Sequence, residues 1–136
     1  MRLEITRRTD LALRALRAME GSPQPRKGAD VAAEIGTTQA FLAQVVAPLV
    51  RAGWVVSDPG PRGGYRAAVP LTEVSVLDLI EAVEGPVVDG RCVLNDGPCP
   101  APSEPCALHE AWSAARDALL DQLRATPVSA QEATPW

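Results

Sequence analysis

The 136-residue sequence predicts one domain, or one domain with an extended arm, and its 46% hydrophobic content excludes wholesale disorder. No apolar run approaches the roughly 18 residues of a membrane-spanning helix, and charges interrupt the apolar N-terminal stretch, so we expect a cytoplasmic protein without a signal peptide or membrane partner. The net charge of −4 by itself argues against nucleic-acid binding, but the distribution of the charge along the chain reverses that interpretation.

The charge is strongly polarised along the chain. Residues 1–70 hold ten Lys and Arg against six Asp and Glu, a net charge of +4. Residues 71–136 hold three Lys and Arg against eleven Asp and Glu, a net charge of −8. This polarity favours a basic working face for nucleic acid and an acidic body, with uneven surface decoration as the alternative.

Three stretches with helical apolar spacing lie in the first half of the chain. They run from about Thr9 to Glu20, from Ala29 to Ile35 and from Phe41 to Leu49. Gly36 is a suitable end for the second helix, so the second and third helices form a helix-turn-helix. Pro48 lies inside the third helix and is expected to kink or loosen it unless tertiary contacts compensate.

A β-hairpin is predicted directly after the third helix. Trp54–Ser57 and Tyr65–Val69 have strand composition, and the Pro- and Gly-rich segment between them is a turn. A hairpin in this position is a wing. The predicted fold is therefore mostly α with a small β-hairpin wing, and the winged helix-turn-helix occupies residues 1–70.

Residues at the start of the third helix and at the wing tip are candidates for DNA contact. A recognition helix enters the major groove with its N-terminal residues at the base edges. Gln39 and Gln44 suit adenine, Ala43 suits a thymine methyl group, and a wing-tip arginine suits the minor groove. A three-helix domain used for protein contacts is the alternative. The candidate set is Thr37, Thr38, Gln39, Ala43, Gln44, Arg62, Gly63, Gly64 and Tyr65.

The second half, residues 71–126, is predicted to hold two helices around a long loop. Ser75-x-x-Asp78 indicates a capped helix that ends at Gly85, and a long C-terminal helix is expected from about Ala107 to Ala125. Residues 86–106 hold five prolines, two glycines and all three cysteines, which predicts a segment held by something other than an apolar core. Residues 127–136 are expected to form a flexible tail.

The loop contains Cys92, Cys99 and Cys106 with six residues in each gap, and the only histidine, His109, follows three positions later. An odd cysteine count does not suit a disulfide framework, and the Cys-x-x-Cys pair of structural zinc sites is absent from the sequence. Long, even gaps suit a loop wrapped around an iron–sulfur cluster. Idle cysteines and a metal-free thiol redox regulator are the alternatives. No third group for a Cys–His nucleophile is indicated, so we do not expect an enzyme.

Taken together, these features resemble the IscR/NsrR family of winged-helix regulators over roughly residues 1–126. The resemblance is carried by MRLEITRRTDLALRAL, ADVAAEIGTTQAFLAQVVAPLVRAGWV, RGGYRAA, VSVLDLIEAVEG and the three cysteines followed by ALHEAW. It implies a homodimeric transcription factor, with repression the favoured activity, that binds a double-stranded DNA operator. It also implies that the C-terminal helix is the dimerisation helix and that the loop cysteines hold an iron–sulfur cluster.

The resemblance leaves two choices for the cluster. In the nitric-oxide-sensing branch, a 4Fe–4S cluster takes its fourth ligand from an acidic residue in the first helix of the partner subunit, and Asp10 falls on that position. In the cluster-assembly branch, a 2Fe–2S cluster uses a histidine after the third cysteine, and His109 falls there. The N-terminal run is closer to the first branch. We therefore expect a 4Fe–4S cluster, with nitric oxide or an oxidant as the signal.

Overall fold

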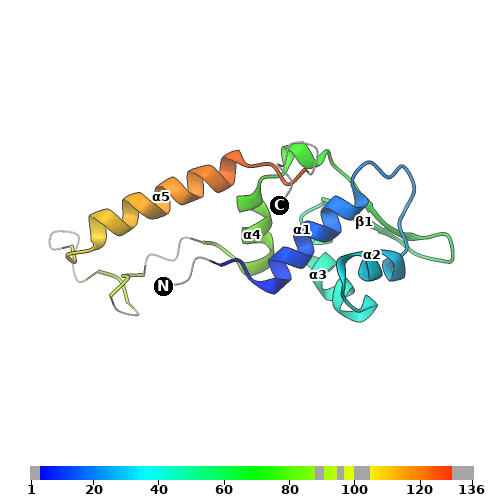
Figure 1. Cartoon of the computed structure of the whole chain (residues 1–136), viewed down its shortest axis with the longest axis horizontal. Helices are drawn as coiled ribbons and strands as arrows, with labels where there is room; N and C mark the ends of the chain where they lie inside the picture. The colour runs from blue at the N-terminus through cyan, green and yellow to red at the C-terminus, as the bar shows by residue number, and fades with distance from the viewer. Residues whose placement is uncertain (1–3, 88–90, 95–96, 100–104, 130–136) are drawn as a thin grey trace.

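The computed structural model describes residues 4–87, 91–94, 97–99 and 105–129. Helices α1 to α4 and a hairpin form a head, and α5 projects from it as an arm (Figure 1). This confirms the predicted class, mostly α with a small hairpin wing and a long C-terminal helix. No described helix has both the length and the apolar character needed to cross a membrane. The elements are α1 (Arg7–Met19), α2 (Gly28–Ile35), α3 (Gln39–Arg51), β1 (Val55–Asp58), β2 (Gly64–Ala67), the 3-10 turn η1 (Leu71–Glu73), α4 (Val76–Glu84) and α5 (His109–Ala125).

Hydroxyl side chains set the starts of three helices. Thr6 caps α1 by accepting a hydrogen bond from the backbone N–H of Thr9, so this helix begins two residues before the predicted start. Thr38 caps α3 as the sequence predicts. Ser75 and Asp78 form the predicted capping box at the start of α4.

Helix α3 is continuous through Pro48, where the sequence predicts a kink or a loosened turn unless tertiary contacts compensate. Proline has no N–H, so the carbonyl of Gln44 loses its usual partner one turn later. The Arg8 side chain of α1 donates to this carbonyl, with Nη2 3.1 Å from the oxygen. The proline ring is itself buried in the head. A tertiary contact therefore supplies the hydrogen bond that the helix lacks.

The core of the head lies where α1 packs against α2, α3 and α4. Apolar residues repeat at helical spacing on the inward faces of these helices, and their side chains fill one continuous cluster. The cluster extends to β1 and to the chain after α5. Its largest fully buried side chains include Leu16, Met19, Leu42, Leu49 and Leu79.

The wing is attached to the head through the strand at its inner edge. β1 pairs antiparallel with β2, and the backbone of Tyr65 also exchanges two hydrogen bonds of 2.8 Å with Arg26, just before α2. A Cβ on Gly64 would lie 2.2 Å from the Arg26 oxygen. Only glycine allows this approach, so Gly64 has a structural role in holding the wing.

The segment after α5 returns to the head and packs there, in contrast to the predicted flexible tail. Val128 is fully buried, its N–H bonds to the Val74 oxygen at 2.8 Å, and its carbonyl accepts from Arg17 at 2.9 Å. The hydroxyl of Ser129, also fully buried, bonds to Glu20. For residues 127–129 the prediction is therefore wrong, because Val128 fills part of the core. The remainder, residues 130–136, lies outside the described residues.

We predict that Val128→Ala lowers the free energy of unfolding by about 2 kcal/mol, because it removes two buried methyl groups. Val50→Ala is the matched control, since Val50 is 39% exposed, and its expected change is within about 0.5 kcal/mol. Denaturant unfolding followed by circular dichroism measures both values. Equal, small changes in the two variants would show that the segment after α5 does not stabilise the head.

Candidate metal centre and nucleic-acid interface

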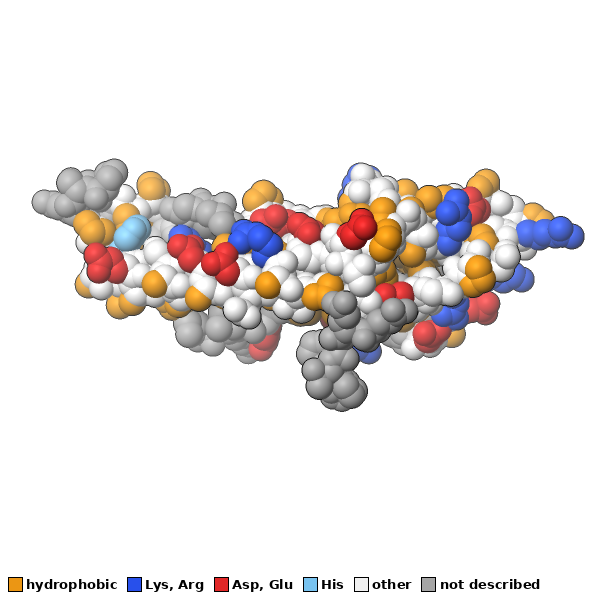
Figure 2. All heavy atoms as spheres, turned by 90° about the horizontal axis from the view of Figure 1, so that it is seen from above, with side chains coloured by type: hydrophobic (Ala, Val, Ile, Leu, Met, Phe, Trp, Pro, Cys, Tyr) orange, Lys and Arg blue, Asp and Glu red, His pale blue; other side chains and the backbone are white. Residues whose placement is uncertain are grey.

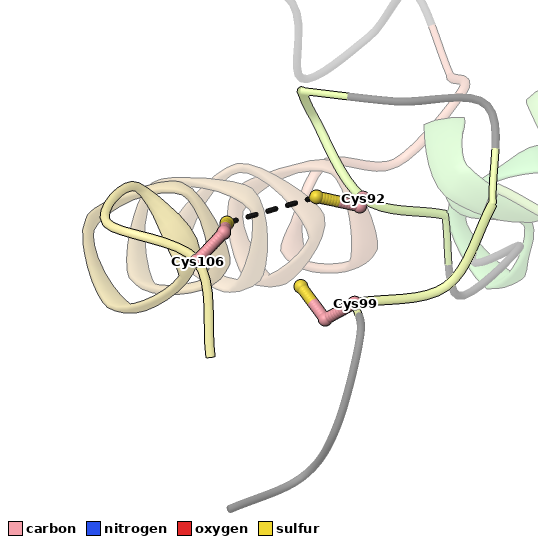
Figure 3. Close-up of side chains that lie close together, drawn as sticks. All are labelled: Cys92, Cys99 and Cys106. Carbon is pink, nitrogen blue, oxygen red and sulfur yellow. Dashed lines mark hydrogen bonds between the residues drawn. The ribbon is translucent and has the colours of Figure 1, made fainter. Parts of the chain in front are cut away.

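The three loop cysteines point toward one another (Figure 3). Their Sγ atoms all lie within 4.8 Å of one another, and those of Cys92 and Cys106 are 3.6 Å apart. Cys92 and Cys99 come from the loop, whereas Cys106 lies in the turn that leads into α5. Cys92 is buried, and Cys99 and Cys106 are half-buried. The structure thus brings together three residues that the sequence singles out as metal ligands.

The single histidine lies beside this triad. The Nδ1 atom of His109 is 3.3 Å from Sγ of Cys99, and its backbone N–H bonds to the Cys106 oxygen at 2.9 Å. These groups line a cavity of about 110 Å³ together with Trp112 and Arg116. Sequence spacing left the role of His109 open between a ligand and a helix cap. Among the described residues, the group of mutually close ligand atoms holds the three sulfurs and not the imidazole, so the ligand role of His109 stays a prediction.

Arg116 adds positive charge to the cavity. Its Nε atom is buried and has no hydrogen-bond partner within the described part of the chain. The Asp117 carboxylate is 3.7 Å away, which is too long for a hydrogen bond. A guanidinium that lines the same cavity as three thiols, with one N–H group unbonded, suits an anionic group there.

The surroundings of the Cys106 thiol disfavour its charged form. Desolvation and the neighbouring thiols of Cys92 and Cys99 raise its pKa, and a backbone hydrogen bond from Leu108 opposes them. A cation bound to the sulfurs would offset this cost. Thiolate ligands select soft metals, zinc and iron–sulfur clusters among them. The residues present thus fit an iron–sulfur centre.

The expected fourth ligand of the other family branch lies on the head. Asp10 is in the first turn of α1, where its carboxylate accepts from Arg14 at 3.0 Å. It borders a groove of about 720 Å³ that Ile5, Leu13 and Ile35 also line. Within one described chain Asp10 does not belong to the group of ligand atoms that contains the three thiols. Its supply by the partner subunit stays a prediction.

Glu84 connects the head to the start of the cysteine segment, and sequence reasoning missed it. One carboxylate oxygen accepts from the Thr6 backbone N–H at 3.2 Å, from the Thr6 hydroxyl at 2.9 Å and from the Thr9 hydroxyl. Glu84 is the last residue of α4, and Gly85 follows it. Two threonine hydroxyls three residues apart at a helix start were the available signal, since such a pair binds a carboxylate well.

The candidate DNA-contacting residues lie along α3 and the wing. Gln39, Ala43 and Gln44 are exposed on one face of α3, and Arg62 is exposed at the wing tip. A hollow of about 370 Å³ lies between the start of α3 and the wing, lined in part by Gln39 and Tyr65. Gly63 and Gly64 belong to the wing turn and its attachment, Thr37 is half-buried, and Thr38 caps α3.

The space-filling view agrees with the charge division along the sequence. Lys and Arg side chains gather mostly at the head-and-wing end, and acidic side chains lie along the arm (Figure 2). The basic end is also the end that carries α3 and the wing. A surface of this charge attracts the phosphate backbone of DNA without regard to sequence.

A family model described as Rrf2, an iron-dependent transcriptional regulator, matches residues 5–130. The chain belongs to the Rrf2 family. It is 36% identical over 98 residues to the HTH-type transcriptional regulator IscR of Aliivibrio salmonicida, which covers 72% of this chain and 55% of that protein. Among solved structures, it is similar to CymR, the global cysteine regulator of Bacillus subtilis, with a TM-score of 0.77, 25% identity and coverage of 93% and 94%. The oxidised form of Staphylococcus aureus CymR gives a TM-score of 0.74 at 26% identity, covering 98% and 100%.

Family membership confirms the predicted resemblance at the level of Rrf2 regulators. These proteins are transcriptional regulators and not enzymes, as the sequence predicts. Cluster type and signal remain predictions for this chain.

We predict that Glu84→Ala lowers the free energy of unfolding by about 1 kcal/mol at neutral pH, because hydroxyl and amide donors lose a partly exposed acceptor. Partial burial acts to raise the pKa of Glu84, but hydrogen bonds from Thr9 and Thr6 outweigh it and hold the pKa below its ordinary value. The stabilisation is therefore present above the ordinary carboxyl pKa and is lost as the pH falls through the lower, folded-state pKa.

Denaturant unfolding of wild type and variant from neutral to acidic pH measures this effect, and the difference between them is expected to close in acid. Glu81→Ala, on the same helix, is the control. The Glu81 carboxylate accepts a long, weak hydrogen bond of 3.5 Å from the nearby Val87 N–H. A gap of constant size at every pH would contradict the role assigned to the Glu84 carboxylate.

Proposed function

We propose that the protein is a cytoplasmic, homodimeric, DNA-binding transcriptional repressor whose affinity for its operator is set by an iron–sulfur cluster. Cys92, Cys99 and Cys106 would hold the cluster, and nitric oxide or oxidative stress would be the signal. The convergence of three cysteine sulfurs within 4.8 Å of one another, in a Pro-rich loop beside the cavity that Arg116 lines, carries this proposal. When bound, the cluster supplies a centre that reacts with nitric oxide or oxidants.

The fourth ligand divides the proposal into two forms. A 4Fe–4S cluster with Asp10 of the partner subunit is the form favoured by the N-terminal sequence. A 2Fe–2S cluster with His109 is favoured by one contact, the 3.3 Å distance from Nδ1 to Sγ of Cys99. In both forms the fourth ligand is a single side chain, so mutation can remove it.

A thiol-based switch without metal is the second candidate function. It is supported by the 3.6 Å between the sulfurs of Cys92 and Cys106, which are close enough to pair after a small movement. The similarity to CymR in its oxidised form is in keeping with such chemistry. In this form oxidation of two thiols to a disulfide, with the two electrons passing to an oxidant, replaces loss of a cluster.

The arm supports pairing of two copies. Leu108, Trp112 and Leu119 are 44%, 38% and 42% exposed, whereas Leu120 is buried in the arm. Helix α5 packs on α4, yet Leu120 is the only residue of this 17-residue helix that is buried in the described part of the single chain. Packing against the arm of a second copy would remove the exposed apolar side chains of this helix from water.

We predict that protein purified without oxygen contains iron and acid-labile sulfide and absorbs in the visible range. Asp10→Ala is expected to change the spectrum and the iron content if the partner's carboxylate is a ligand, and His109→Ala is expected to do so if the imidazole is. Replacing Cys99 with Ser removes a ligand in both forms and is the positive control. Iron-free protein would contradict the cluster and favour the thiol switch.

We also predict that the protein binds a duplex operator through α3 and that nitric oxide weakens this binding. Gln44→Ala is expected to cost about 1–3 kcal/mol of binding free energy and to relax the preference at one base pair, if its amide reads that base. Gln122→Ala, on the arm, is the control and is expected to have no effect. Anaerobic titration with nitric oxide, followed by DNA binding and cluster absorbance together, tests the signal. Unchanged binding after the cluster is destroyed would contradict it.

A further inference from the structure

The recognition helix contains a carbonyl group that cannot form its normal helical hydrogen bond. The oxygen of Gln44 would accept from the N–H four residues later, but that residue is Pro48, which has none. In the structure, Nη2 of Arg8 lies 3.1 Å from this oxygen and donates to it. The helix stays regular across the proline, so the side chain of one helix completes the hydrogen bonding of another.

The hydrogen bond joins the middle of α3, the proposed DNA-contacting helix, to the first turn of α1. Gln44 lies on the exposed face of α3 together with Ala43, in the middle of the helix. Arg8 lies in the first turn of α1, next to Thr9, which donates to Glu84 at the end of α4. A helix that lacks an internal bond bends easily at that point. Its straightness, and with it the position of its N-terminal half, therefore depends on Arg8.

We propose that Arg8 is a positioning residue for DNA recognition. It holds the carbonyl that Pro48 leaves free, and so it fixes the DNA-contacting half of α3 relative to the first turn of α1. Arg8 does not need to touch DNA for this role. The proposal rests on the function proposed above, because it concerns the affinity of the same α3 for the operator.

A double-mutant cycle between Arg8 and Pro48 tests this role. Arg8→Ala is expected to weaken operator binding about tenfold, the size of one hydrogen bond to a charged donor. Pro48→Ala restores the missing N–H, so the helix completes its own hydrogen bond and no longer needs the arginine. In that background, Arg8→Ala is expected to change the affinity by less than about twofold.

The salt dependence of binding separates positioning from direct contact. A side chain that neutralises a phosphate lowers the slope of log affinity against log salt by about one when it is removed. We expect Arg8→Ala to weaken binding with the slope unchanged. Arg124→Ala, on the arm, removes an equal charge far from α3 and is expected to alter neither quantity. Circular dichroism confirms that each variant is folded, and Arg8→Met keeps the apolar stem if the alanine variant does not fold.

Two results would overturn the proposal. The first is an equal loss of affinity for Arg8→Ala in both backgrounds together with a lower salt slope, which would make Arg8 a phosphate contact. The second is no loss of affinity in either background. Both are distinct from failure of the proposed function, in which folded wild-type protein would bind no operator at all.

Discussion

The hydrogen bonds around the first turn of α1 are the interaction on which the rest of the structure depends. Glu84 at the end of α4 accepts from Thr6 and Thr9, and Arg8 in the same turn donates to the Gln44 carbonyl of α3. The turn is thus bonded on one side to the element that leads into the cysteine segment and on the other to the element proposed to read DNA. A displacement of this turn would therefore change the hydrogen bonds to both α4 and α3.

The arm has two connections to the head, one at each end. At its C-terminal end, Val128 is buried in the core and fixes the arm. At its N-terminal end, Cys106 and His109 belong to the cysteine cluster, whose loop runs back to Gly85 and α4. The end with the thiols is therefore joined to the head through the loop, and a group bound by the thiols, as proposed, would act at this joint.

Local patterns in the sequence were sufficient for the helix-turn-helix, the wing and the capping box, because each is set by residues a few positions apart. The convergence of the cysteines was also predicted, from their even spacing in a Pro-rich loop. Contacts between distant segments were not predictable in the same way. Val128 has no neighbours in sequence that mark it as core, and the partner of the Gln44 carbonyl depends on how α1 crosses α3. For the Gln44 carbonyl, Pro48 was the advance signal, since a proline inside a helix requires compensation from elsewhere.

The most direct measurement is the operator affinity of one protein preparation in two states, with its metal centre intact and after removal of the metal by a chelator under reducing conditions. Fluorescence anisotropy without oxygen measures both values on the same duplex. A switch at the cysteine centre requires the two affinities to differ by tenfold or more, about 1.4 kcal/mol of coupling free energy. Equal affinities, with the metal shown to be absent from the second state, would contradict it.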